Sequence, residues 1–230
     1  MSEFNLLSSL FYRIISIKSL FVIVFSLNSI VGFSQGSNGS DDSSSALLDI
    51  KLLKDSNLGI FVETNVNSFV CEFSDEDTYK GTLFKGTMEN SDEVEVLFKK
   101  GGIKLPVNKF DCGKNMMNND FRELLKSDKY PNIKLEFIKA FWYDQDNLNS
   151  KTDRNKEIGY FIINLTVAGK TQKEKVPIYT TETQAGQLKC TGRVRINMKE
   201  FGLKPPVKFL GTVKVKEHIE VRFNLHFIRL

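Results

Sequence analysis

The chain has 230 residues, of which 41% are hydrophobic, 26% charged and 11% aromatic. This length suits one domain of ordinary size, and this composition excludes a chain that is disordered throughout. The formal net charge is +4, but Lys residues are mixed with Glu and Asp along the chain. That mixing excludes the continuous basic stripe of a nucleic-acid-binding protein. A mild attraction to anionic membrane surfaces is left open.

The first part of the chain has the features of a bacterial signal peptide. Two basic residues precede an apolar run at 20–27, and small residues follow it up to Ser34. The run is shorter than the roughly 20 apolar residues that span a bilayer. We therefore interpret residues 1–34 as a signal peptide and expect a periplasmic or secreted protein. The alternative is an uncleaved membrane anchor over residues 14–31.

Residues 35–45 contain only Gly, Ser, Asn, Asp and Gln, which is typical of a flexible polar tether. The folded domain is expected to span residues 46–230. Within it, apolar and polar residues alternate with a period of two, the pattern of strands with one covered face. The alternation is clearest at 133–137, 188–198 and 219–227. Further strands are expected at 58–63, 67–73, 79–87, 93–99, 103–110, 157–167 and 173–181.

One segment departs from this period. Phe121, Leu124 and Leu125 have the i, i+3, i+4 spacing of a short amphipathic helix, which Asn118 or Asn119 can cap. Eight or nine strands that are each apolar on one face close naturally into a barrel. We predict an all-β fold, an extended antiparallel eight-stranded β-barrel with one short helix. A two-sheet sandwich is the alternative.

Three cysteines occur, and export would permit a disulfide that leaves one thiol over. Cys190 lies on the apolar face of an expected strand, where a buried thiol is the common state. Cys71 and Cys112 are therefore the candidates for a disulfide bond. Whether they are joined is left open by the sequence.

Four stretches, in the same order along the chain, resemble the YceI-like family. They are "LGIFVETNVNSFVCEF", "KNMMNNDFRELLKSDKYPNIKLEF", "INLTVAGKTQKEKVPI" and "MKEFGLKPPVKFLGTVKVKEHIEVRFNLHF". The resemblance implies a lipocalin-like barrel whose interior holds an isoprenoid or another long apolar chain, in a periplasmic or secreted protein. The chain departs from the family at Asn67-Ser68, where many members have His-Ser. The resemblance therefore leaves the polar end of the ligand undefined.

The candidate ligand-binding residues are apolar positions expected to face the barrel interior. An eight-stranded barrel is just wide enough to be filled by its own side chains or to hold one small ligand, so both roles stay open for each residue. The candidates are Leu135, Phe137, Tyr160, Ile162, Val194, Ile196, Val221, Phe223, Leu225 and Phe227.

No catalytic or metal-binding residues are assigned. The two histidines, His218 and His226, would be roughly 25 Å apart along one strand, too far to share a metal. A Gly-x-Ser-x-Gly motif is absent, and Cys190 has no plausible activating histidine. We therefore expect a non-enzymatic protein without a cofactor, whose partner is an apolar small molecule such as an isoprenoid or fatty lipid. The alternative is a closed barrel that acts as an interaction or stress-response module without a ligand. The oligomeric state is left open.

Overall fold

The computed structural model describes residues 46–73, 75–80, 82–90, 93–144, 156–208 and 212–230. Contacts divide the chain into two units, and every described residue belongs to the second, Asp42–Leu230. The expected signal peptide and tether lie outside the described residues. In the described segments, no helix has the length and apolar character needed to cross a membrane.

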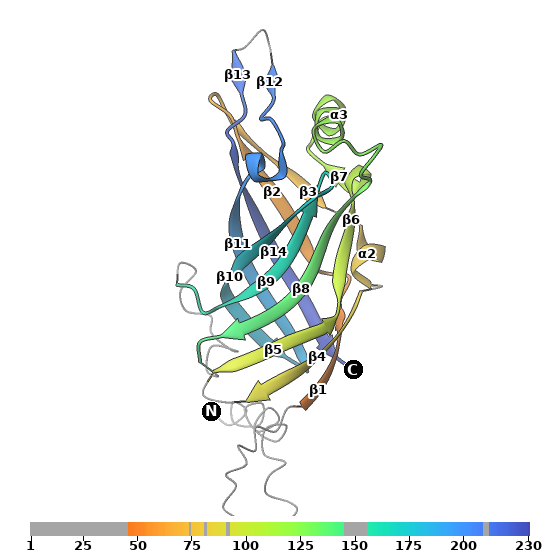
Figure 1. Ribbon diagram of the computed structural model, residues 1–230, viewed down its shortest axis with the longest axis vertical. Coiled ribbons are helices and arrows are strands. Elements are labelled where there is room, and N and C mark those ends of the chain that lie inside the picture. Colours follow the sequence, from red (N-terminus) through yellow and green to blue (C-terminus); the bar gives the residue numbers. More distant parts are fainter. Residues whose placement is uncertain (1–45, 74, 81, 91–92, 145–155, 209–211) are drawn as a thin grey trace, which may run out of the picture. The chain divides into compact units, whose positions relative to one another are not determined.

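Most of the described chain forms antiparallel strands, as the alternating pattern predicted. Eight of them form a closed ring in which each strand pairs with the next and the last pairs with the first (Figure 1). In ring order they are β1 (Ala46–Leu52), β4 (Leu83–Asn90), β5 (Val94–Lys100), β8 (Asn132–Trp142), β9 (Gly159–Val167), β10 (Lys170–Gln184), β11 (Gln187–Asn197) and β14 (His218–Arg229). The predicted all-β, eight-stranded antiparallel fold is confirmed.

Four further strands extend the ring at one end. They are β2 (Asn57–Glu63), β3 (Ser68–Phe73), β6 (Gly102–Pro106) and β7 (Phe110–Asp111). β2 and β1 share one edge of β14, which pairs with β2 over residues 220–224 and with β1 over 227–229. In the same way, β6 and β5 share one edge of β8. We call the end that contains β1, β4 and β5 the closed half and the end that contains β2, β3 and β6 the open half, because no described pairing joins β3 to β6.

Short helices and a hairpin accompany the open half. They are α2 (Glu76–Lys80), η2 (Val107–Lys109), α3 (Asn115–Leu124), η4 (Met198–Phe201) and the hairpin of β12 (Val207–Lys208) with β13 (Val213–Lys214). In Figure 1, α3 and this hairpin lie at the end of the barrel opposite β1 and β4.

The predicted helix is present but begins at Asn115, earlier than expected. Asn118 and Asn119 do not cap it, because both lie inside the helix and the N-cap position is Lys114. The Asn118 side-chain oxygen instead accepts a hydrogen bond from the Cys112 N–H at 2.6 Å. The prediction of a strand at 79–87 was wrong at its start, since Tyr79 belongs to α2. The first turn of α2 is acidic and its last turn is basic, an order that favours a helix.

The interior of the closed half is filled by phenylalanine rings. Phe84, which is 1% exposed, has ring-centroid distances of 5.1 Å to Phe137, 5.7 Å to Phe98 and 5.9 Å to Phe227. The crossing angles are 60–79°, in the range of favourable edge-to-face contacts. The Phe84 ring also covers Gly101, where a Cβ atom would lie 2.2 Å from it. The glycine lets the ring pack directly on the backbone where β5 leads into β6.

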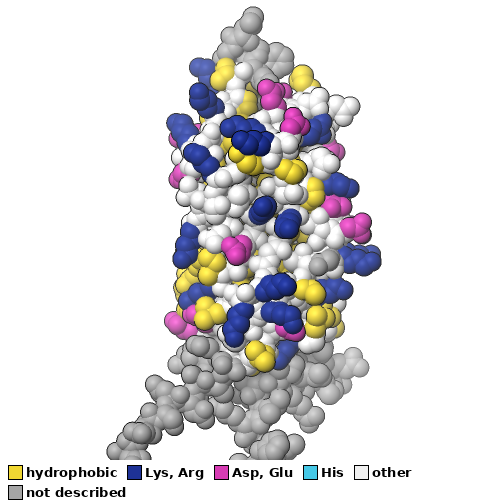
Figure 2. Space-filling view, turned by 45° about the vertical axis from the view of Figure 1, so that its right-hand side comes forward, with side chains coloured by type: hydrophobic (Ala, Val, Ile, Leu, Met, Phe, Trp, Pro, Cys, Tyr) yellow, Lys and Arg dark blue, Asp and Glu magenta, His cyan; other side chains and the backbone are white. Residues whose placement is uncertain are grey.

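The outer surface is polar and carries charges of both signs. On the face shown in Figure 2, Lys and Arg side chains are spread from one end of the barrel to the other instead of forming one patch. Several are paired with carboxylates, including Lys85 with Asp49 at 3.1 Å and Lys175 with Glu157 at 2.8 Å. Such a surface faces water, so the apolar side of each strand must face the interior.

Candidate ligand cavity

The open half contains a cavity of about 380 Å³. Its floor is the edge of the phenylalanine cluster, because Phe137, Phe161 and Phe223 both line the cavity and contact other rings of that cluster. The Phe223 ring packs over Gly192 of β11, where a Cβ atom would lie 2.2 Å from it. The cavity therefore stops where the aromatic filling begins.

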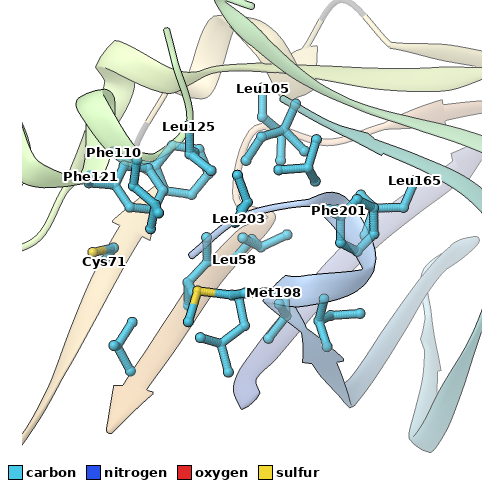
Figure 3. A pocket seen from close by; sticks show the side chains of 18 of the residues that line it. Leu58, Cys71, Leu105, Phe110, Phe121, Leu125, Leu165, Met198, Phe201 and Leu203 are labelled. Carbon is cyan, nitrogen blue, oxygen red and sulfur yellow. The ribbon is translucent and has the colours of Figure 1, made fainter. Parts of the chain in front are cut away.

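The walls and roof of the cavity are almost entirely apolar. Aliphatic side chains from β2, β6, β9, β11 and β14 form the walls. The roof comes from α3 and η4, and Figure 3 shows side chains such as Leu58, Leu105, Leu125 and Phe201 meeting around one space. Each comes from a different segment of the chain: β2, β6, the end of α3 and η4. The cavity thus depends on the complete open half.

The cavity reaches solvent beside α3. Val66 and Met116 line it and are 65% and 59% exposed, so its mouth lies between the β2–β3 turn and the start of α3. The turn is held by Thr64, whose hydroxyl accepts from the backbone N–H of Asn67 at 2.9 Å. Asn67 also lines the cavity at this mouth. An apolar molecule could enter here from solvent.

Cys71 and Cys112 form a disulfide bond. It joins β3 to the segment that follows β7, and Cys71 itself lines the cavity. The bond lies in the half where β3 and β6 are not paired. It therefore supplies a covalent link in a wall that lacks a continuous hydrogen-bond ladder.

Two polar side chains of the lining are of special interest. Glu174 on β10 is half-buried and lines the cavity with Val176 of the same strand. Burial raises its pKa above the usual value, and the negative charge of Glu200 adds to this. Tyr79 of α2 also lines the cavity and is 2% exposed. Burial raises its pKa too, so the phenol stays neutral.

Most of the predicted interior residues lie where the sequence placed them. Seven of them line the cavity: Leu135, Phe137, Val194, Ile196, Val221, Phe223 and Leu225. Phe227 lies deeper, in the closed half, where its ring contacts Phe84 and Phe161.

The prediction was wrong for Tyr160 and Ile162, which lie on the outer side of β9. The buried residues of this strand are Phe161, Ile163 and Leu165. Tyr160 instead contacts the ring of Phe141 and the ammonium group of Lys175. Because both sides of β9 carry large apolar residues, its alternation could not tell the interior from the exterior.

Sequence reasoning predicted the helix that supplies part of the roof but missed the η4 part of the roof, Tyr79 and Glu174. The roof residues Met198, Phe201 and Leu203 come from a short 3-10 helix and the loop after it, which have no strand period. Glu174 had a usable signal, since it lies two residues before Val176 and therefore on the same side of the strand. Tyr79 had no such signal.

The described residues contain no group of three metal-ligating side chains. The remaining thiol, Cys190, is fully buried, and burial raises its pKa to about 12. A thiol with so high a pKa is not a nucleophile at neutral pH. Within the described residues, the geometry is that of an antiparallel strand ring whose open half contains an apolar cavity that reaches solvent.

A family model described as a YceI-like domain matches residues 61–227. The chain belongs to the YceI-like family. None of the curated proteins compared with this sequence matches it.

Solved structures that are similar to this chain include three from different organisms. BcnA from Burkholderia cenocepacia is 16% identical, with a TM-score of 0.48 over 74% of this chain and 95% of that one. A polyisoprenoid binding domain from Saccharophagus degradans is 10% identical, with a TM-score of 0.49 over 80% and 99%. A YCEI protein from Campylobacter jejuni is 12% identical, with a TM-score of 0.42 over 90% and 97%.

Proposed function

We propose that this protein is an exported, non-enzymatic binding protein that holds an isoprenoid-like or fatty lipid in the cavity of its open half. The observation that carries this proposal is the cavity itself, with its apolar walls, aromatic floor and exposed mouth. Its volume of about 380 Å³ falls within the roughly 300–1,000 Å³ typical of small-molecule sites. Membership of the YceI-like family supports the same role. Export is supported by the signal-peptide pattern of residues 1–34.

Burial of an apolar chain supplies the affinity in this proposal. Each methylene that leaves water contributes about 0.8 kcal/mol, so a chain of ten carbons gives a gross gain of about 8 kcal/mol. Association and ordering cost at least about 4 kcal/mol of this. A longer chain is therefore retained more tightly until it fills the cavity. The first test is mass spectrometry of an organic extract of the natively purified protein, which should contain a long-chain apolar molecule.

Filling the cavity should abolish binding without unfolding the barrel. Val194 on β11 lines the cavity and is half-buried, whereas the next residue, Arg195, is exposed on the other side of the strand. Val194→Trp places an indole in the ligand space, and Arg195→Trp places the same group outside. We expect the first variant to lose at least about tenfold in affinity for a fluorescent apolar probe, since an occupied space does not accept a second group. The second variant should bind like the wild type.

A ligand-free interaction or stress-response module is the second candidate function. It is favoured by the phenylalanine filling of the closed half, which shows that side chains alone can occupy the interior of this barrel. In that case the native extract contains no apolar molecule, and neither tryptophan variant changes probe binding. Both results together would exclude the carrier function.

A further inference from the structure

Tyr79 contains a buried hydrogen-bonding group whose partner is not supplied by the barrel. Its side chain is 2% exposed and lines the cavity. Among the described residues, the Tyr79 hydroxyl is the only buried side-chain nitrogen or oxygen without a hydrogen-bond partner. Buried polar groups in folded proteins are almost always bonded, because an unbonded one destabilises the fold. A hydroxyl in this position is accounted for if a bound molecule supplies the partner.

The position of Tyr79 places that partner at the inner end of the cavity. β3 runs from Ser68, beside the turn at the mouth, to Phe73. Tyr79 packs edge-on against the Phe73 ring, with centroids 5.5 Å apart. It therefore lies at the far end of β3 from the exposed Val66. A ligand atom that is hydrogen-bonded to Tyr79 therefore lies the length of β3 away from the mouth.

The charges of the lining indicate that this ligand atom is neutral. Among the described residues that line the cavity, one side chain is cationic, that of Lys114, which precedes α3 at the mouth. The other charged members of this lining are carboxylates, Asp120 and Glu174. A phosphate or carboxylate at the inner end would lose its hydration without gaining an opposite charge, which is strongly unfavourable. An alcohol or carbonyl oxygen needs only the one hydrogen bond that a neutral phenol donates.

We propose that Tyr79 donates a hydrogen bond to a neutral alcohol or carbonyl oxygen at the inner end of the bound chain. The ligand is then an oxygenated, uncharged lipid that lies with its oxygen innermost and its hydrocarbon chain directed toward the mouth. This inference rests on the proposed binding function and specifies the class of ligand and its direction in the cavity.

The test compares two probes of equal size, decan-1-ol and undecane, on the delipidated protein. Their affinities are measured by displacement of the fluorescent probe N-phenyl-1-naphthylamine. Tyr79→Phe removes the hydroxyl alone, and Tyr143→Phe is the matched control, because the Tyr143 hydroxyl is bonded to Glu157 at 2.5 Å outside the cavity. We expect Tyr79→Phe to lower the affinity for decan-1-ol by about 3- to 10-fold relative to the affinity for undecane. Tyr143→Phe should leave this ratio unchanged.

A second measurement separates a ligand partner from a structural one. Removing a hydroxyl that has no partner should leave the Tm of the ligand-free protein unchanged or raise it. If Tyr79→Phe instead lowers the Tm and leaves the decan-1-ol to undecane ratio unchanged, the hydroxyl serves the fold and the inference is overturned. Tighter binding of decyl phosphate than of decan-1-ol by the wild type would also overturn it. Failure of both decan-1-ol and undecane to bind the wild type would reject the binding function itself.

Discussion

The two halves of the barrel share strands but differ in what their interiors contain. β8, β9, β11 and β14 run through both halves. In the closed half β1 completes the ring, and phenylalanines such as Phe84 and Phe98 fill it. In the open half the ring lacks a described β3–β6 pairing, and aliphatic residues surround a cavity.

This difference shows that strand number alone does not decide whether the barrel can hold a ligand. An eight-stranded barrel is at the limit where side chains can either fill it or leave room for a small molecule. Here large rings fill one end, and smaller residues under a roof of short helices leave space at the other. The filled half can serve as the stable part of the fold, while the hollow half carries the site.

The largest effect is expected from a ring of the closed half. Phe84→Ala should lower the free energy of unfolding by about 3–5 kcal/mol, because the neighbouring rings cannot collapse fully into the space. Val194→Ala in the open half should cost about 1 kcal/mol or less, since its side chain already borders a cavity. Urea unfolding measures both losses. Equal losses would contradict the division into a filled and a hollow half.

The disulfide of the open half should have the next largest effect. Replacing Cys71 and Cys112 together by Ser frees a loop with a sequence separation of 41 residues. The expected loss is about 2–4 kcal/mol, because the unfolded chain gains conformational freedom. Apolar-probe affinity should fall as well, since β3 is part of the cavity wall. Dithiothreitol should lower both the free energy of unfolding and the probe affinity of the wild type in the same way. It should change neither quantity in the double variant.

The sequence predicted the strand ring because alternation is decisive wherever only one face is apolar. β11 and β14 are such strands, and their inward residues were predicted correctly at Val194 and Phe223. β9 is apolar on both faces, so Tyr160 was assigned to the wrong side. The period of a strand also does not distinguish a filled interior from a hollow one, which depends on how rings such as Phe84 and Phe137 meet across the barrel.

The cavity residues of α2 and η4, unlike those of α3, were beyond the reach of the pattern. Tyr79 lies on a five-residue helix where alternation with its neighbours favoured a strand. The roof residues Phe201 and Leu203 follow β11 in a segment without periodicity. Their positions depend on contacts between segments that are distant in sequence, and one sequence alone does not contain that information.

The smallest expected effect concerns Glu174, the carboxylate on a strand among the described residues that line the cavity. Glu174 is half-buried, and its pKa is raised first by burial and then by the charge of Glu200 on η4, the element that packs on this part of β10. A raised pKa means that the folded state binds the proton more tightly than the unfolded state. Glu174 therefore favours folding most at pH values below its unfolded pKa, and this contribution is lost as the pH rises through the folded pKa.

At neutral pH the ionised Glu174 should thus destabilise the fold slightly. Glu174→Gln, which resembles the protonated form, should raise the free energy of unfolding at pH 7 by no more than about 1 kcal/mol, because water reaches a half-buried group. The gain should disappear near pH 4, where the wild-type carboxyl is protonated as well. Glu200→Gln is the control, and it should give a smaller gain by removing only the second cause. Urea unfolding at both pH values measures these differences, and a gain that is equal at pH 4 and pH 7 would show that charge is not its origin. An ionisable residue is tolerated at this position of β10 because its side chain is only half-buried, whereas further along the strand, in the closed half, the fully buried positions are taken by Ile178 and Thr181.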